Sequence, residues 1–312
     1  MQEINTSHNL HEWDLTTLFL PSFSTKACGR LVAELNLLKI SLFIASAVAL
    51  SACVADQASI DTESRAIAVD QQAEPAGAAG PQSAASVASL LPATGPTYVT
   101  LTVAQPDSSG APQKDSTASP ITSGSGFVVS EDGYVITAAH VAVAKGNEIS
   151  ARAANGRVYS GTVVGVFPTN DMALVKLRSF QGRAVAPAAP GCVAQGDVIY
   201  TLGKPHGMGD TARIGTLQSK HFGRSVAYGK FGYPDALVLH MGTQRGESGG
   251  PVFNKQGQLV AMVVSTLSDE TGQSINMAHA IPANTLGQFL CTMTSCSAQW
   301  AAVSRGNVDT CG

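Results

Sequence analysis

The segment Arg245-Gly246-Glu247-Ser248-Gly249-Gly250-Pro251 places a serine in a glycine-flanked loop directly before an apolar run, Val252-Phe253. Glycine has no Cβ, so the backbone of such a loop can turn its N–H groups toward a ligand. We expect the N–H groups of Gly246 and Ser248 to converge on a developing negative oxygen, which is the requirement for an oxyanion hole. The segment therefore favours a nucleophilic serine that is followed by a β-strand.

A nucleophilic serine also needs a base, and the sequence offers one upstream. The strand-like run Tyr134-Val135-Ile136-Thr137-Ala138-Ala139-His140 ends on a histidine. Between it and the serine, Asp171 opens the alternating run Met172–Leu177. Each residue alone has an ordinary structural explanation, as a core histidine, a helix cap or a turn. The three together, in the order His140, Asp171, Ser248, predict a catalytic triad.

These segments resemble the trypsin-like serine peptidases of the chymotrypsin fold, and in particular their bacterial HtrA/Deg-like branch. Three further stretches match that family in its own order, namely Ser123–Val129, Leu202–Gly207 and Ala280–Asn284. The resemblance implies an all-β fold of two six-stranded antiparallel β-barrels, over about 121–190 and 191–290, with a short closing helix from Asn284 to Cys291. It also implies that His140 and Asp171 come from the first barrel and Ser248 from the second.

Two other functions compete with this interpretation. Gly246–Gly250 also matches the nucleophile elbow of α/β-hydrolases, and Asp269 and His279 follow in that order. That fold requires a helix after the serine, whereas Pro251–Asn254 and Leu259–Val264 have strand patterns, so we reject it. The second alternative is a non-catalytic or conditionally inactive barrel of the same fold that binds extended peptides.

The resemblance also places a specificity pocket. Trypsin-type enzymes keep an aspartate at the position of Gly242, so selection of lysine or arginine is not expected. Thr243 matches a position that glutamate-selecting relatives use, and His279 or His240 would have to replace their missing histidine. We expect small apolar residues at the cut site, with acidic residues as the alternative. Val264-Ser265-Thr266 is expected to pair with the substrate backbone as an added strand.

Glu247 stands where trypsin-type enzymes keep an aspartate that pairs with a newly cut N-terminus. The sequence has no Ile-Val-Gly-Gly start. We therefore expect no activation of that kind, and we expect Glu247 to face solvent or a loop partner.

The N-terminal part of the sequence indicates export. Residues 39–53 contain a basic residue, a short apolar run and the ending Leu50-Ser51-Ala52-Cys53, which is typical of a secretory signal. That ending resembles the bacterial lipobox and predicts acylation of Cys53; an ordinary signal peptide is the alternative. We expect a lipid anchor in the bacterial cell envelope, at the outer membrane facing the periplasm. Residues 1–38 look like a mis-annotated extension before the true start.

The remaining organisation follows from composition. Residues 54–120 are rich in Ala, Ser, Pro and Gln and predict a disordered tether, although Tyr98–Val103 has the pattern of a short strand. Residues 121–290 are the expected peptidase domain, and 291–312 form a cysteine-containing tail. The HtrA branch usually carries a PDZ domain at this point, and we expect none in this chain.

Four cysteines remain in the exported part, and an even number suggests two disulfides. Three pairings are possible, and free buried thiols are the alternative. The resemblance to trypsin-like relatives implies Cys192–Cys291 together with Cys296–Cys311.

The composition also limits the partners. The chain is 44% hydrophobic and 13% charged with a net charge of −3, so it offers no basic surface for nucleic acid. The cysteines and histidines do not have zinc-site spacing, and we expect no metal and no cofactor. Protein or peptide substrates and, through the lipid, a membrane are the expected partners. The oligomeric state cannot be predicted from the sequence.

Overall fold

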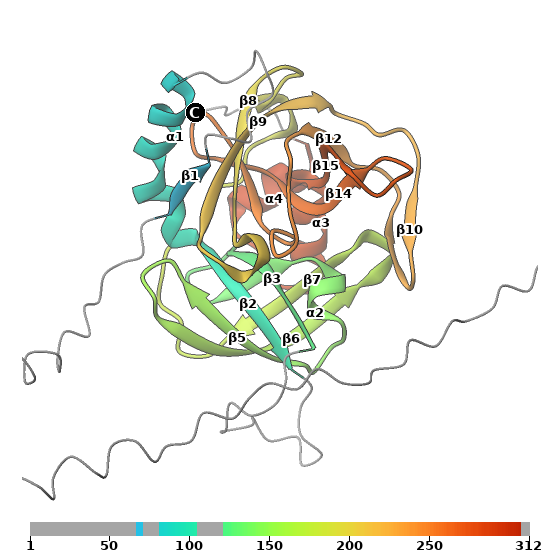
Figure 1. Ribbon diagram of the computed structural model, residues 1–312. Coiled ribbons are helices and arrows are strands. Elements are labelled where there is room, and N and C mark those ends of the chain that lie inside the picture. The colour runs from blue at the N-terminus through green and yellow to red at the C-terminus, as the bar shows by residue number, and fades with distance from the viewer. Residues whose placement is uncertain (1–66, 71–80, 105–120, 307–312) are drawn as a thin grey trace, which may run out of the picture. The chain divides into compact units, whose positions relative to one another are not determined.

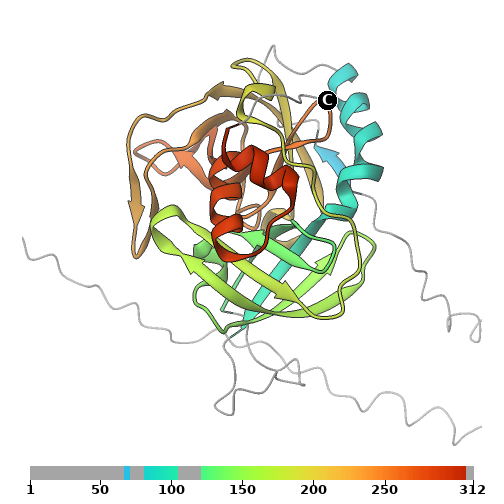
Figure 2. The same cartoon turned by 180° about the vertical axis from the view of Figure 1, so that it is seen from behind.

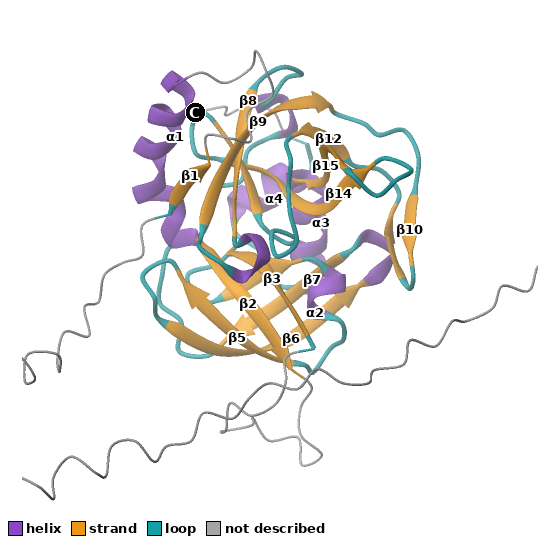
Figure 3. Ribbon diagram, viewed as in Figure 1, coloured by secondary structure: helices purple, strands orange, loops and turns teal. Residues whose placement is uncertain are grey.

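The computed structural model describes residues 67–70, 81–104 and 121–306. The predicted extension, signal segment and Cys53 lie outside these residues, as do Cys311 and part of the expected tether. Within the described part, β-strands form two closed barrels, and helices occupy their outside (Figures 1 and 3). No helix of the described residues is both long enough and apolar enough to span a bilayer.

The first barrel closes six antiparallel strands in the order β2-β3-β4-β7-β6-β5. Burial along β6 alternates, as expected for a strand with one face toward the core and one toward solvent. The strands are β2 (Tyr98–Ala104), β3 (Thr122–Val128), β4 (Tyr134–Thr137), β5 (Glu148–Ala153), β6 (Val158–Phe167) and β7 (Met172–Leu177). A short helix α2 (Ala139–Ala142) follows β4, and a single turn η2 (Pro168–Asn170) precedes β7.

The second barrel also has six strands, in the order β9-β12-β15-β14-β13-β8, and it closes because β8 pairs back with β9. Its strands are β8 (Val198–Gly203), β9 (Thr211–Ser219), β12 (Leu237–His240), β13 (Pro251–Asn254), β14 (Leu259–Ser268) and β15 (Ser274–Pro282). A separate hairpin, β10 (Val226–Tyr228) and β11 (Phe231–Tyr233), lies between β9 and β12 in the sequence. Two antiparallel six-stranded barrels confirm the predicted chymotrypsin-like fold.

The prediction of a tether over 54–120 is wrong for the described residues of that range. β2 belongs to the first barrel, which therefore begins at Tyr98 rather than at residue 121, and the expected strand at Tyr98–Val103 is confirmed. Before it lie β1 (Ala68–Asp70), which pairs in parallel with β9, helix α1 (Pro81–Thr94) and the turn η1 (Gly95–Thr97). The composition was misleading because α1 orders by burying one apolar stripe, including Ala84 and Val87, against the core.

The chain ends in two helices on the side of the molecule that Figure 2 shows, α3 (Ala283–Met293) and α4 (Ala298–Ser304). α3 confirms the expected closing helix. Cys291 and Cys296 form a disulfide with a Cα–Cα distance of 4.8 Å. The implied pairing of Cys192 with Cys291 and of Cys296 with Cys311 is therefore wrong, because the turn after α3 brings these two near neighbours together. Cys192 is itself disulfide-bonded.

Candidate active site

His140 and Asp171 form a hydrogen-bonded pair at one end of the first barrel. Asp171 Oδ2 lies 2.9 Å from His140 Nδ1, and Oδ1 accepts the backbone N–H of His140 at 3.0 Å. Asp171 follows η2 in a left-handed conformation, with φ +47°, and its side chain is fully buried. A buried carboxylate on Nδ1 orients the ring and leaves Nε2 to exchange a proton with a nucleophile.

Ser248 lies in the loop between β12 and β13, and both barrels hold this loop. Ser125 of β3 donates its backbone N–H to the Ser248 carbonyl at 2.8 Å and its hydroxyl to the Gly246 carbonyl at 2.7 Å. Gly249 has φ +82°, and a Cβ there would lie 2.2 Å from the Ser125 carbonyl oxygen, so only glycine fits. The loop thus joins the barrel that carries Ser248 to the barrel that carries His140 and Asp171.

The expected oxyanion donors are the N–H groups of Gly246 and Ser248. The carbonyl of each of these two peptide groups accepts a hydrogen bond that fixes the peptide plane. The carbonyl of Arg245 accepts from His206 N–H at 2.7 Å, and that of Glu247 accepts from Gly250 N–H at 2.9 Å. In a trans peptide the N–H points away from the carbonyl, so the N–H groups of Gly246 and Ser248 are directed away from these partners. Neither N–H, nor the Ser248 hydroxyl, has a hydrogen bond to another described residue. Both donors are available to a ligand.

Glu247 does not face solvent. Its side chain is fully buried, and Oε1 lies 2.7 Å from Nε of Arg213 on β9, which is also buried. Glu247 also accepts the backbone N–H of Gln244. Of the two environments expected for Glu247, solvent is wrong, whereas Gln244 is a partner from the same loop. The countercharge from Arg213, on a distant strand, was not expected. This buried ion pair anchors the serine loop from within.

The predicted specificity residues separate onto two faces of the β14–β15 pair. Thr243 Oγ1 lies 2.7 Å from Thr266 Oγ1. His279 pairs with Ser265, which directly precedes Thr266 on β14. Side chains of successive strand residues point to opposite faces of the sheet. Tyr233 bonds both Ser265 and His279 at 2.8 Å. His279 and Thr243 therefore lie on opposite faces and do not form one pocket together, and the assignment of His279 to substrate binding stays a prediction.

Other features bear on the pocket and cleft. Gly242 faces Asn276, whose Oδ1 would lie 2.7 Å from a Cβ added to the glycine. Sequence reasoning missed Asn276, which has no motif around it. The half of β14 from Val264 onward pairs with β15 on one side, and no described strand pairs with its other side. That free edge is suitable for an added strand.

Two further residues that sequence reasoning missed lie against the His140–Asp171 pair. Tyr228 of β10 donates its hydroxyl to Asp171 Oδ2, and its ring centroid lies 5.8 Å from that of His140. Phe231 of β11 lies 6.4 Å from the same imidazole. The short runs around Gly229-Lys230 had the pattern of a two-residue hairpin, but nothing in them indicated contact with Asp171.

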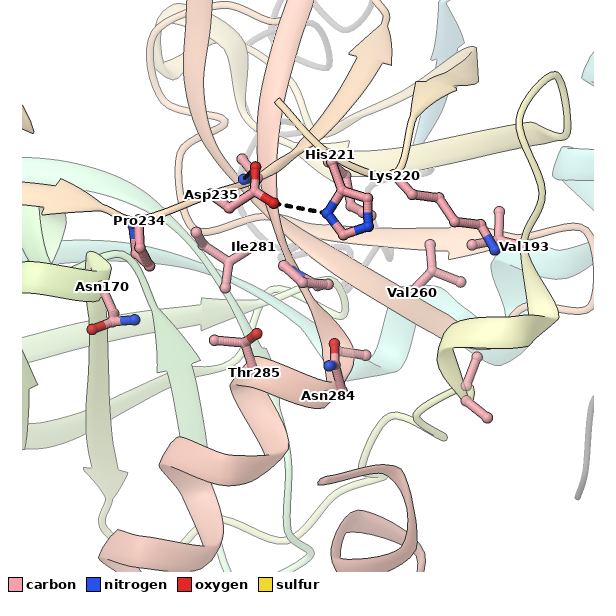
Figure 4. A pocket seen from close by; sticks show the side chains of 16 residues that line it. Asn170, Val193, Lys220, His221, Pro234, Asp235, Val260, Ile281, Asn284 and Thr285 are labelled. Atoms are coloured by element: carbon pink, nitrogen blue, oxygen red, sulfur yellow. Dashed lines mark hydrogen bonds and ion pairs between the residues drawn. The ribbon is translucent and has the colours of Figure 1, made fainter. Parts of the chain in front are cut away.

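A separate pocket of about 270 Å³ lies beside the start of α3 (Figure 4). Its polar wall contains the ion pair of His221 and Asp235, 2.8 Å apart and largely exposed. Burial opposes ionisation of Asp235, but hydrogen bonds from His221 and from backbone N–H groups lower its pKa overall. None of the three predicted triad residues lines this pocket, so it is distinct from the candidate active site.

Comparison with known proteins agrees with this geometry. Residues 124–262 match the family model described as a trypsin-like peptidase domain. A probable periplasmic serine endoprotease DegP-like of Brucella suis biovar 1 (strain 1330) is 32% identical over 173 residues, which are 55% of this chain and 33% of that protein. The periplasmic serine endoprotease DegP of Escherichia coli (strain K12) is 29% identical over 191 residues, which are 61% and 38% of the two chains.

Solved structures give the same fold. The HtrA-type protease AlgW with tripeptide has a TM-score of 0.54 at 23% identity, over 70% of this chain and 64% of that chain. The match to the HtrA-type protease AlgWS227A with decapeptide also has a TM-score of 0.54, at 23% identity, and covers 65% of each chain. The chain spans about a third of the length of the curated relatives it matches. Residues 124–262 thus match a trypsin-like peptidase domain, and the solved HtrA-type structures share the fold.

Proposed function

We propose that this chain, whose residues 124–262 belong to a trypsin-like peptidase domain, is a serine endopeptidase. The proposal depends on one observation: two parts of a serine-peptidase site come from different barrels. One is the buried Asp171 carboxylate on Nδ1 of His140. The other is the Ser248 loop, in which the N–H groups of Gly246 and Ser248 bond to none of the described residues and their peptide groups are anchored through the carbonyls.

The proposed mechanism assigns one role to each group. The Ser248 hydroxyl attacks a peptide carbonyl while Nε2 of His140 takes its proton, and Asp171 stabilises the imidazolium that forms. The N–H groups of Gly246 and Ser248 stabilise the oxyanion. His140 then protonates the leaving amine, which leaves an ester on Ser248. Water hydrolyses that acyl-enzyme with His140 again acting as the base.

An extended peptide would bind along the free edge of β14 at Val264-Ser265-Thr266, as an added strand. The AlgW structures with a tripeptide and a decapeptide support a peptide ligand for this fold. Gly242 places no carboxylate at the pocket, and Thr243 and Thr266 engage each other's hydroxyls. We therefore infer a preference for small apolar side chains at the cut site.

A fluorophosphonate probe tests the activity. It should label the wild-type protein and fail to label Ser248→Ala, and His140→Ala should lose nearly as much reactivity because the triad acts as a unit. A conditionally inactive barrel is the second candidate, because no described residue hydrogen bonds to the Ser248 hydroxyl. An unlabelled but folded and peptide-binding wild type would favour that candidate and refute constitutive activity.

We further propose that the protein is exported to the bacterial cell envelope and acylated at Cys53, which lies outside the described residues. The periplasmic names of the relatives support the compartment, and Leu50-Ser51-Ala52-Cys53 supports the lipid. A palmitate analogue should label the wild-type protein and not Cys53→Ser, which should become soluble. A mature N-terminus at another residue would refute acylation at this site.

A further inference from the structure

The hairpin β10–β11 has one aromatic face, and two residues of that face contact the His140–Asp171 pair. Tyr228 pairs with Phe231, and Val226 with Tyr233, across a two-residue turn. Residues that are directly opposite or two apart share a face of a strand pair, so these four side chains lie together, while Ala227 and Gly232 point the other way. The sequence thus builds a small aromatic surface on a hairpin that pairs with no other described strand.

This surface bridges the two barrels. In Figure 1, β10 runs down the side of the second barrel toward the first. β11 packs against η2, the turn that directly precedes Asp171. At the other end, the Tyr233 hydroxyl bonds to Ser265 of β14 and His279 of β15. The hairpin is therefore held to the second barrel while its aromatic face reaches the aspartate of the first.

The Tyr228 hydroxyl adds a hydrogen bond to Oδ2 of the buried Asp171 carboxylate, which has fewer donors than Oδ1 without it. Oδ1 accepts the backbone N–H of His140, and both oxygens lie within 3.1 Å of Nδ1. The Tyr228 hydroxyl supplies a further donor, on Oδ2, and lies 3.4 Å from Nδ1. A fully buried carboxylate needs such donors, because loss of hydration is otherwise uncompensated.

The hydroxyl keeps its proton. Burial, followed by the negative charge of Asp171, raises the pKa of Tyr228. A phenol with a raised pKa stays neutral at working pH and can only donate to the carboxylate. Its ring edge meanwhile packs at 74° to the imidazole plane of His140, which restricts rotation of the ring.

We propose that Tyr228 is a positioning residue of the triad, which fixes the Asp171 carboxylate and the His140 ring from the hairpin of the opposite barrel. The proposal rests on the function assigned above to His140, Asp171 and Ser248. Its consequence is that correct docking of the β10–β11 hairpin becomes a condition for full reactivity of Ser248.

Tyr228→Phe tests this role, since it retains the ring and removes only the hydroxyl. We expect the rate of fluorophosphonate labelling, and kcat on a peptide substrate, to fall roughly tenfold with KM little changed, as for loss of one hydrogen bond to a charged group. The matched control is Tyr233→Phe, which removes the other buried hydroxyl of the same hairpin without touching Asp171.

Proton NMR provides a readout that does not depend on activity. The Nδ1 proton of His140 should give a low-field resonance. Tyr228→Phe should move it further downfield, because Oδ2 then accepts from one donor fewer, whereas Tyr233→Phe should leave it in place. An unmoved resonance in Tyr228→Phe, or an equal shift in Tyr233→Phe, would overturn the proposal. A wild-type protein that fails to react with the probe would instead refute constitutive peptidase activity, and the NMR measurement would still decide the role of Tyr228.

Discussion

The buried ion pair between Arg213 and Glu247 allows a quantitative test of what holds the Ser248 loop. Arg213→Met removes the cation and keeps most of the side-chain volume, which leaves the Glu247 carboxylate buried without this partner. Both side chains are almost completely inaccessible, at 5% and 0%. Removing one member of such a pair typically lowers the free energy of unfolding by about 3–5 kcal/mol. That is a large fraction of the roughly 5–15 kcal/mol that stabilises a domain.

The double variant Arg213→Met/Glu247→Leu separates charge burial from packing. Well-packed apolar replacements for a buried pair are often neutral, so the double variant should recover most of the lost stability. It should not recover reactivity, because Glu247 also accepts the Gln244 N–H that shapes the oxyanion loop. Urea unfolding measures the first effect, and the rate of fluorophosphonate labelling measures the second.

Arg178→Met is the control, because Arg178 and Glu148 form an exposed pair at 2.8 Å. Exposed pairs contribute about 0–1 kcal/mol, so this variant should unfold nearly as the wild type does. The reasoning would be refuted if Arg213→Met were no more destabilising than Arg178→Met. It would also be refuted if the double variant were as unstable as the single one.

Three other predictions concern the disulfide, a buried histidine and the pocket. Cys291→Ser should lower the free energy of unfolding by about 2 kcal/mol, because the disulfide closes a short loop and so removes little entropy from the unfolded chain. A loss above about 4 kcal/mol in urea unfolding would contradict this prediction. Burial, and then the nearby Arg224 cation, lower the pKa of His279 below 6.5, so the unfolded chain binds its proton first as pH falls. Stability should therefore be fully present above about pH 6.5 and decline below it, less steeply in His279→Gln than in wild type when urea midpoints at about pH 7.5 and pH 5.5 are compared. A peptide-library cleavage profile should show cuts after alanine or valine and slow turnover after lysine or arginine. A pocket without a buried carboxylate cannot offset the desolvation of a cation. Dominance of glutamate at the cut site would contradict the expected pocket.

Much of the fold could be predicted because its signals are local. The loop around Ser248 has glycines with positive φ at Gly246 and Gly249, and the alternation of β6 follows from its one buried face. The composition of residues 54–120 was a weaker guide. A helix such as α1 is stabilised by the surface it packs on, and that surface comes from distant parts of the chain.

The sequence by itself determined the residue types at the candidate site, namely the histidine, the aspartate and the serine in its glycine loop, since chemistry and backbone conformation there are local properties. Tertiary structure decided which groups surround them. Tyr228 and Arg213 reach Asp171 and Glu247 from strands that the sequence does not connect to the site. Strand register placed His279 on the face away from Thr243. Such contacts depend on how two closed barrels meet, and no local pattern of residues encodes that geometry.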